Sequence, residues 1–409
     1  MEAPRREAAA LLRGVGRGPQ AAGALAAAIA AGLYLAVRFR DVQGFVEAVD
    51  HTPRLFHDFS HYYYATARSV SEGRGPAAGY LYTPFFALLL RPLASLSLEQ
   101  ARWAWGGVQV LLVGSLSVLA LRWSRPTAPH AFVAVAATLL STAVLHDVKW
   151  GQVGVLLAVL GLAATWRYAA GRWLSAALLL SVAISIKLYP VVLVAMFLLR
   201  RDLRALATSG AAVALLTWAL PLAVLGERRT RRFYRKVGAF LEATADTAAG
   251  DPNSQAFASW LPRLWRDPPA HAAEAIAAAA VLLAAAALLR AHIPPETRTA
   301  FASFLALALL PFGVATSWAN YFASLPAFGA FLLGQVRSHA ALPRALLAAA
   351  ILCALALASF PAVDLAGSWR EYVGRRWLLQ ADLILLVAAL VHLELTRRAG
   401  AAMVGRRLD

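Results

Sequence analysis

Apolar residues in this chain gather in blocks long enough to cross a lipid bilayer, and this feature constrains the fold more than any other. A membrane-spanning helix needs roughly 20 predominantly apolar residues, and such blocks occur at 21–37, 205–225 and 377–395. Hydrophobic residues make up 60% of the chain and charged residues 15%, whereas soluble domains contain about 45–50% and about 25%. The sequence therefore predicts an all-α polytopic membrane protein in one integral domain, residues 1–409.

Arginine clusters between the apolar blocks indicate the topology, because cytoplasmic loops collect positive charge. The stretch 84–98 is short, lies between prolines and contains Arg91, so we expect a partly embedded juxtamembrane element. If 84–98 crossed the membrane fully, the arginine clusters near Arg122 and Arg200 would lie outside, which the preference for cytoplasmic positive charge disfavours. We expect 21–37 to be a retained first span, because no clear cleavage site follows it.

If 84–98 does not cross the membrane, the sequence predicts eleven or twelve spans with both ends of the chain cytoplasmic. The loops 38–101, with juxtamembrane helices, and 226–270 lie outside, although the second begins with the basic run ERRTRRFYRK. We expect a multi-pass protein of a bacterial plasma membrane with its site facing the periplasm or exterior. The main expected spans are 21–37, 103–121, 130–146, 151–166, 174–187, 190–199, 205–225, 272–290, 299–313, 344–360 and 377–395.

Charge and cysteine content exclude several classes of protein. The net charge of +17 comes from short arginine clusters between apolar blocks, so it does not indicate nucleic-acid binding. The single cysteine, Cys353, excludes an internal disulfide bond and a cysteine-based metal site. Lysine is rare: Lys149, Lys187 and Lys236 are the only three, which makes each one a candidate for function.

Several polar residues converge on the expected outer face, and ionisable groups at a membrane are functional candidates by default. They are Asp58 in the first loop, Lys149 in the turn 146–150, Lys187 at the tip of a short hairpin, Arg263 in the long loop, and Trp318 with Asn320 near the next outer end.

Each of these candidates also has a structural interpretation. Asp58 could only cap a helix that starts near Phe59, and Lys187 could be a lysine that snorkels from a helix end. Tyrosines 62–64 are typical of interfacial anchors. His57 and His61 share a helical face, but no strong third metal ligand accompanies them, so we expect no metal site.

Six segments together resemble glycosyltransferase family 87, the polyprenyl-phosphate-mannose-dependent mannosyltransferases with the C-type (GT-C) membrane fold. The resemblance spans about residues 55–330. Asn320 stands where that family usually has histidine, and Asn253-Ser254-Gln255 departs from its Asn-Gln-Ser order. The matching segments are DFSHYYYATARSVSEGRG, YTPFFALLLRPL, KWGQVGVLL, IKLYPVVLVAMFLLRR, DPNSQAFASWLPRL and TSWANYF.

The resemblance implies a role for each matching residue. Asp58 would be the general base that deprotonates the acceptor hydroxyl, and Lys187 with Arg263 would bind the donor phosphate. Further donor contacts would come from Lys149, Tyr189, Asn253, Gln255, Trp318 and Asn320. Acceptor contacts would come from His57, His61, Tyr62 and Tyr82.

The implied reaction is an inverting, metal-independent transfer of a sugar, by resemblance mannose, from a polyprenyl-phosphate donor. No cofactor is expected; the acceptor would be a glycolipid or polysaccharide of the cell envelope, and membrane lipids surround the protein. Three alternatives stay open: another lipid-linked hexose or pentose as donor, a carrier or flippase of lipid-linked sugars, and a non-catalytic scaffold.

Overall fold

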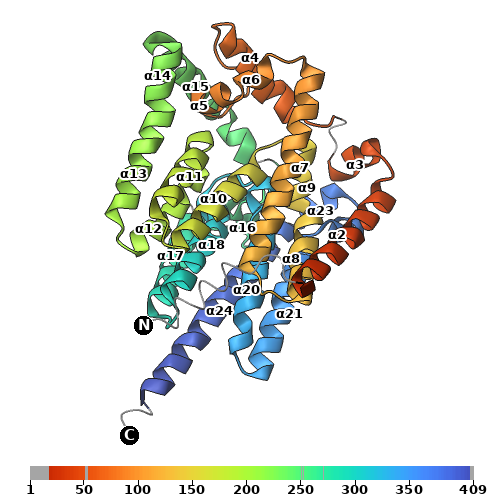
Figure 1. Ribbon diagram of the computed structural model, residues 1–409, viewed down its shortest axis with the longest axis vertical. Helices are drawn as coiled ribbons and strands as arrows, with labels where there is room; N and C mark the ends of the chain where they lie inside the picture. The colour runs from red at the N-terminus through yellow and green to blue at the C-terminus, as the bar shows by residue number, and fades with distance from the viewer. Residues whose placement is uncertain (1–17, 51–53, 250, 252, 270, 406–409) are drawn as a thin grey trace.

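The computed structural model describes residues 18–50, 54–249, 251, 253–269 and 271–405, and these residues form helices throughout. Within those ranges the only β-type pairing is an isolated bridge between Ser141 and Ser359. The arginines at 5, 6, 13, 17, 406 and 407, which contributed to the expected topology, lie outside the described residues. The prediction of an all-α polytopic membrane protein is confirmed (Figure 1).

In the described part of the chain, five helices are long and apolar enough to cross a membrane. The shortest has 19 residues, which corresponds to roughly 28 Å at 1.5 Å per residue. Together with the shorter helices they make ten apolar helices, so the count of eleven or twelve spans stays a prediction. The five long ones are α2 (Gly18–Phe39), α13–η3–α14 (Leu203–Leu225), α7 (Leu98–Trp123), α17 (Ala272–Arg290) and α24 (Trp377–Gly405). The shorter ones are α8 (Ala128–Leu139), α10 (Gly154–Ala169), α11 (Trp173–Ile186), η2–α12 (Tyr189–Leu199) and α21 (Ala341–Leu357).

Helix α2 shows how its sequence divides a span into a lipid face and a packed face. Leu25, Ile29 and Leu33 are more than half exposed and recur every four residues, so they share one face. The buried face carries small residues and packs against α8: a Cβ added to Gly23 would collide with the carbonyl oxygen of Ala128. Small residues allow such close approach of two helices in a membrane.

The centre of the bundle is filled by helices that are more buried than the peripheral spans. Helices α18 (Pro295–Ala308) and α20 (Leu325–Gln335) consist largely of buried residues. Their phenylalanine rings stack, with 5.1 Å between the centroids of Phe304 and Phe328. This core holds the bundle together beneath the loops that carry the candidate site.

The first long loop folds into short helices, as the sequence predicts. The stretch 84–98 contains α5 (Pro84–Leu89) and α6 (Arg91–Ala94), of six and four residues. Neither is long enough to cross a bilayer. The rest of the loop comprises α3 (Val42–Val49), the π-helical turn η1 (Phe59–Tyr64) and α4 (Ala65–Ser71).

Three expected boundaries are wrong. The span 299–313 is interrupted at Leu309, between α18 and α19 (Leu310–Gly313). The span 130–146 is interrupted, since α8 ends at Leu139 and α9 begins at Thr142. The segment 146–150, expected as a turn, is the last part of helix α9 (Thr142–Trp150). The reason is local: the Ser141 hydroxyl accepts a bond from Val144 N at 3.4 Å and starts a new helix, which continues to Gly151.

The helix that follows α13–η3–α14 completes the end of the molecule opposite the C-terminus. Helix α15 (Glu227–Ala249) contacts α5 and α14 there, and α4 and α6 lie at the same end in Figure 1. The remaining short elements are α16 (Phe257–Leu264), α19 (Leu310–Gly313), η4 (Ala319–Phe322), η5 (Val336–Ser338), α22 (Phe360–Ala366) and α23 (Trp369–Gly374).

Candidate active site

Asp58 lies immediately before η1, and its carboxylate is held by side chains rather than by the helix. Its side chain makes no capping hydrogen bond, so the interpretation of Asp58 as a simple helix cap does not hold. Gln152 Nε2 donates to Asp58 Oδ2 at 2.5 Å, and His57 Nδ1 lies 3.3 Å from Asp58 Oδ1. The Asp58 side chain is 14% exposed, so it is held in place yet accessible to a small group.

Gln152 joins Asp58 to Asn320, two residues that are 262 positions apart in the sequence. The Asn320 amide nitrogen donates to Gln152 Oε1, and Gln109 donates to the Gln152 carbonyl oxygen at 2.7 Å. An amide whose oxygen already accepts a bond must present its NH₂ group to the other partner. Asn320, where the related family has histidine, therefore fixes the orientation in which Gln152 donates to Asp58.

The loop between α9 and α10 places Gln152 because both of its ends are capped. Gly151 ends α9 with φ +67°, a left-handed conformation. The buried carboxylate of Asp147 accepts from Gly154 N at 2.7 Å and from Val155 N at 3.0 Å, which caps the start of α10. Burial raises the pKa of Asp147 to about 7, although these two backbone bonds act in the opposite direction.

Replacing Gly151 with alanine is expected to destabilise the protein. An L-residue in this conformation costs about 1–2 kcal/mol, and the new Cβ would lie 2.9 Å from Phe59 Cβ. The free energy of unfolding should fall by about 1–3 kcal/mol, measured as a lower melting temperature in detergent. Gly107→Ala is the control, since nothing lies within 4 Å of its added Cβ. Equal melting temperatures for the two variants would contradict this prediction.

Lys187 occupies a cage of three tyrosines at the end of α11. Its Nζ lies 4.7 Å from the Tyr321 ring centroid, 5.4 Å from that of Tyr82 and 5.8 Å from that of Tyr189. Aromatic faces attract a cation at such distances. The cage holds the Lys187 ammonium at the site, which disfavours the interpretation of a lysine that simply snorkels to the surface.

Lys149 is the most unusual cation of the site because it is fully buried without a hydrogen bond. The residue is 0% exposed, and Nζ has no hydrogen-bond partner among the described residues. Its nearest described aromatic group is the Trp150 ring, 4.8 Å from Nζ. Burial lowers the pKa of Lys149 to about 8, although Asp50 and Asp58 favour its charged form.

A second group of side chains joins the Asp58 region to α23. Asp50 accepts from Trp150 Nε1 at 3.1 Å, and His146 Nε2 lies 4.0 Å from the same carboxylate. The His146 ring stacks on Trp369 with 5.0 Å between centroids, and Trp369 Nε1 donates to Asn253 Oδ1 at 3.3 Å. Asn253 therefore connects the long loop to the site through aromatic rings.

The other predicted long-loop residues bind the backbone of α23 and its end. Gln255 Nε2 donates to the carbonyl oxygen of Val373 at 3.1 Å, and Arg263 donates to that of Gly374 at 2.6 Å. Arg263 is exposed and, among the described residues, makes its hydrogen bond to Gly374 and not to Asp58 or Lys187. Trp318 is half-buried beside η4. The structure therefore does not join these three residues to the Asp58 network.

The aromatic segment that follows Asp58 is more buried than interfacial anchors would be. Tyr63 and Tyr64 are 0% and 5% exposed, so that prediction is wrong for both. The Tyr63 and Tyr82 hydroxyls are 2.7 Å apart, which ties η1 to the Lys187 cage. Tyr62 is half-buried, 6.0 Å from His57 between ring centroids.

His57 and His61 stack on each other with 4.1 Å between ring centroids. In the described part of the chain, no group of three His, Cys, Asp or Glu side chains is placed to hold a metal ion.

Three residues of the network were not among the predicted site residues: Gln152, Asp147 and Tyr321. The first two lie in the segment HDVKWGQVG beside Lys149, a motif that already drew attention. Tyr321 follows Asn320 directly. Their position next to these motif residues was the one feature of the sequence that could have indicated all three. The contacts that bring them into the network involve segments far apart in the sequence.

Gln152→Leu should reduce turnover without loosening donor binding. The variant removes the bond that orients Asp58, and misplacement of a reacting group by about 1 Å can cost 10²-fold. We expect kcat to fall about 10- to 100-fold and KM to change little, measured by sugar-transfer kinetics. Gln43→Leu, at an exposed position, is the control. A rise in KM with unchanged kcat would contradict a positioning role for Gln152.

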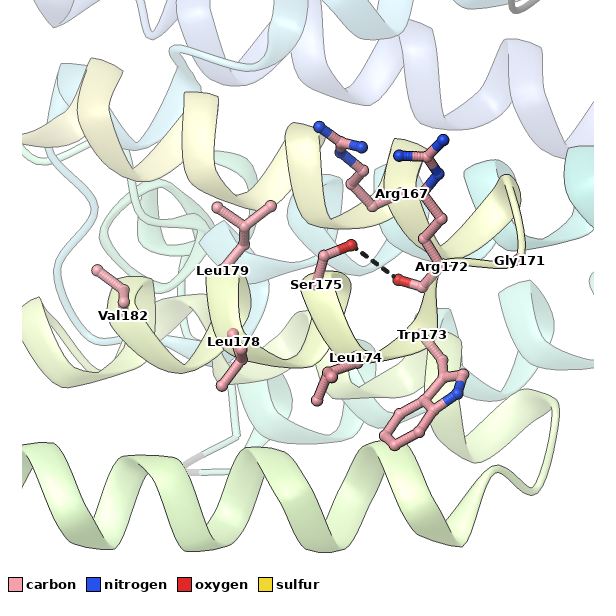
Figure 2. Close-up of a pocket in the computed structure, with 9 residues that line it drawn as sticks. All are labelled: Arg167, Gly171, Arg172, Trp173, Leu174, Ser175, Leu178, Leu179 and Val182. Carbon is pink, nitrogen blue, oxygen red and sulfur yellow. Dashed lines mark hydrogen bonds between the residues drawn. The ribbon is translucent and has the colours of Figure 1, made fainter.

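The described residues also form an open groove of ≈ 720 Å³ away from this network. Figure 2 shows Arg167 and Arg172 extending to one side of the α10–α11 turn, with Trp173 and Leu174 on the other. The groove runs along α11 from Trp173 to Val182, whose position is roughly 7–8 Å from that of Lys187 along the helix. No candidate site residue lines it. The lining residues are Arg167, Gly171, Arg172, Trp173, Leu174, Ser175, Leu178, Leu179 and Val182.

The bundle and the polar network at its end are what a membrane glycosyltransferase requires, and the comparison of sequences supports that class. A sequence model of glycosyltransferase family 87 matches residues 80–302. This is more than half of the chain, so the protein belongs to glycosyltransferase family 87. The matched range includes Lys149, Lys187 and Gln152 but not Asp58 or Asn320. A search of curated proteins found no match.

Proposed function

We propose that the protein transfers a sugar, by family resemblance mannose, from a polyprenyl-phosphate donor to an acceptor hydroxyl, with Asp58 as the general base. The observation that carries this proposal is the Asp58 carboxylate, which makes no helix-capping hydrogen bond, is held by Gln152 and favours the charged form of the nearby Lys149. Tyr82 lies close enough to interact electrostatically with both Asp58 and Lys187. The Lys187 ammonium itself lies 5.4 Å from the centroid of the Tyr82 ring.

The reaction would be a single displacement at the anomeric carbon. Asp58 takes the proton of the acceptor hydroxyl while that oxygen forms the new glycosidic bond. The bond between the anomeric carbon and the phosphate oxygen breaks, and the lipid phosphate leaves with the electron pair. A positioned base typically contributes about 10²–10⁴-fold to such a rate. One displacement inverts the anomeric centre, as the resemblance to the family implies.

Negative charge that grows on the leaving phosphate needs nearby cations. Lys187 is caged by tyrosines, and the Lys149 ammonium is buried with no hydrogen-bond partner among the described residues. Both supply positive charge that is fixed before the substrate arrives. Fixed charges in a site poor in water stabilise a transition state strongly. Lys187 would therefore hold the phosphate, and the buried charge of Lys149 would stabilise it through space, while Asp58 activates the acceptor.

The orientation of this site belongs to the proposal as well. We place it on the outer side of a bacterial plasma membrane, within the loop 38–101 and facing the loop 226–270. A glycolipid or polysaccharide of the cell envelope would be the acceptor. Membrane lipids would bring the donor to the site by its tail.

A transfer assay separates this proposal from a carrier of lipid-linked sugars. Full-length protein in liposomes receives polyprenyl-phosphate-[¹⁴C]mannose and a bacterial lipid extract as acceptor source. Mild acid cleaves the bond between mannose and phosphate in the donor. We expect the label to appear in a new product that resists this treatment. Label that changes leaflet but stays in the acid-labile donor would contradict the proposal and support a carrier.

The proposed role of Lys149 gives a pH dependence. Its pKa is lowered to about 8 by burial, so the buried positive charge that would stabilise the phosphate is lost as the pH rises through that value. We expect kcat/KM to fall above about pH 8. Lys149→Arg should extend the plateau, since arginine stays charged. If kcat/KM of Lys149→Arg fell at the same alkaline pH as that of the wild type, another group would be responsible for the fall.

A further inference from the structure

Helix α15 carries a basic face at the same end of the molecule as the candidate site. Six basic residues lie within 228–236, and Glu227 is the single acidic residue of residues 227–236. Arg231 pairs with Glu227 at 2.8 Å; no ion pair involves the other five in the described part of the chain. Arg228, Arg232 and Arg235 are exposed and recur at spacings of four and three, so they share one face.

The opposite face of α15 anchors the helix to the bundle. Thr230, Phe233 and Val237 are buried, and they also recur at spacings of three and four. The Tyr234 ring stacks on Trp218 with 4.5 Å between centroids. Arg229 and Lys236 lie against Gly73 and Gly75 of the first loop. The basic face is therefore held in a fixed position.

The depth of α15 follows from the span that precedes it. Leu215, Trp218 and Val224 are 58%, 50% and 45% exposed, as expected of side chains that face lipid. This span ends at Leu225, and Gly226, with φ +81°, turns the chain into α15. Arg228 follows two residues later, so the basic face lies at the level where lipid chains give way to headgroups.

We infer that α15 binds the headgroups of anionic phospholipids through Arg228, Arg232 and Arg235. The apolar face of α15 packs on the bundle, so its basic face is left to meet the membrane surface at this depth. Cations near an anionic membrane surface attract it by about 1 kcal/mol each. This function also explains why a strongly basic segment occurs in a loop expected outside, where the positive-inside rule disfavours it.

The headgroups would fix α15 at the membrane surface and, through Arg229 and Lys236, the first loop that carries Asp58. This inference does not depend on sugar transfer, because lipid binding is measured directly. A free anion would be attracted by the same charges, so the test separates lipid from inorganic phosphate.

The test is native mass spectrometry of the full chain in detergent with equal amounts of phosphatidylglycerol and phosphatidylcholine. We expect the wild type to prefer phosphatidylglycerol, and the triple variant R228Q/R232Q/R235Q to lose affinity by about fivefold per cation removed. The triple Arg→Lys variant should keep the preference, because it keeps the charge. The control R91Q/R266Q/R370Q removes three exposed arginines elsewhere and should also keep it.

Two outcomes would overturn the inference. One is an unchanged preference in R228Q/R232Q/R235Q, with folding checked by its melting temperature. The other is release of phosphatidylglycerol by inorganic phosphate but not by chloride at matched ionic strength, which would indicate a site for a free anion. Retention of the lipid in both salts supports headgroup binding.

Discussion

Asp58→Asn should abolish nearly all sugar transfer while leaving the protein folded. Asparagine keeps the shape of the side chain and can still contact Gln152, but it cannot accept the proton of an acceptor hydroxyl. Loss of a general base typically costs about 10²–10⁴-fold, so we expect kcat to fall by that factor. Initial rates of mannose transfer in liposomes, at matched protein amounts, measure the effect.

Two neighbouring carboxylates provide the controls for that variant. Asp41 caps α3 by accepting from Gly44 N at 2.7 Å, and asparagine caps a helix equally well, so Asp41→Asn should be fully active. Asp50→Asn should retain transfer near neutral pH but lose it at a lower alkaline pH than the wild type, because Asp50 favours the charged form of Lys149. Full transfer by Asp58→Asn together with loss in Asp50→Asn would move the base to Asp50.

Lys187→Met should have the second largest effect, because it removes the caged cation from the proposed phosphate site. Loss of one preorganised group that stabilises transition-state charge costs about 10²–10³-fold in kcat. We expect a fall of that size in kcat/KM for the lipid-linked donor, measured by steady-state transfer. Lys187→Arg should recover part of it, because the charge remains within the tyrosine cage.

Arg344→Met is the matched control for the lysine variant. Arg344 is exposed at the start of α21, so its loss removes one positive charge without touching the network. We expect unchanged kinetics. If Lys187→Met and Arg344→Met behaved alike, Lys187 would have no role beyond filling its cage.

The sequence predicts much of this fold because the determining signals are local. Apolar block length and arginine clusters indicate the helices, and the interpretation of 84–98 as juxtamembrane agrees with the short α5 and α6. The rarity of lysine singles out Lys149 and Lys187, and both lie in the network at the end of the bundle.

The remaining features depend on contacts that no local pattern encodes. Gln152 is informative only once Asp58 and Asn320 meet it from distant segments. The cage around Lys187 needs tyrosines from positions 82, 189 and 321. Polar composition suggested a turn at 146–150, but buried partners for His146 and Asp147 make a helix favourable there.

The departure at position 320 also has a structural consequence that the sequence did not show. Asparagine, unlike histidine, cannot be protonated at neutral pH, so it could not replace an imidazole that transfers a proton. In the structure Asn320 is 1% exposed and bonds Gln152. We therefore expect Asn320 to act by orienting an amide, a role that needs no imidazole.

The most direct test of the central hypothesis is donor discrimination by the purified full-length protein in liposomes. Polyprenyl-phosphate-mannose, polyprenyl-phosphate-glucose and GDP-mannose are supplied separately with the same bacterial lipid extract, with and without EDTA. We expect transfer from polyprenyl-phosphate-mannose, unaffected by EDTA, and none from GDP-mannose. Transfer from GDP-mannose, or none from either lipid-linked sugar, would contradict a lipid-phosphate-dependent transferase.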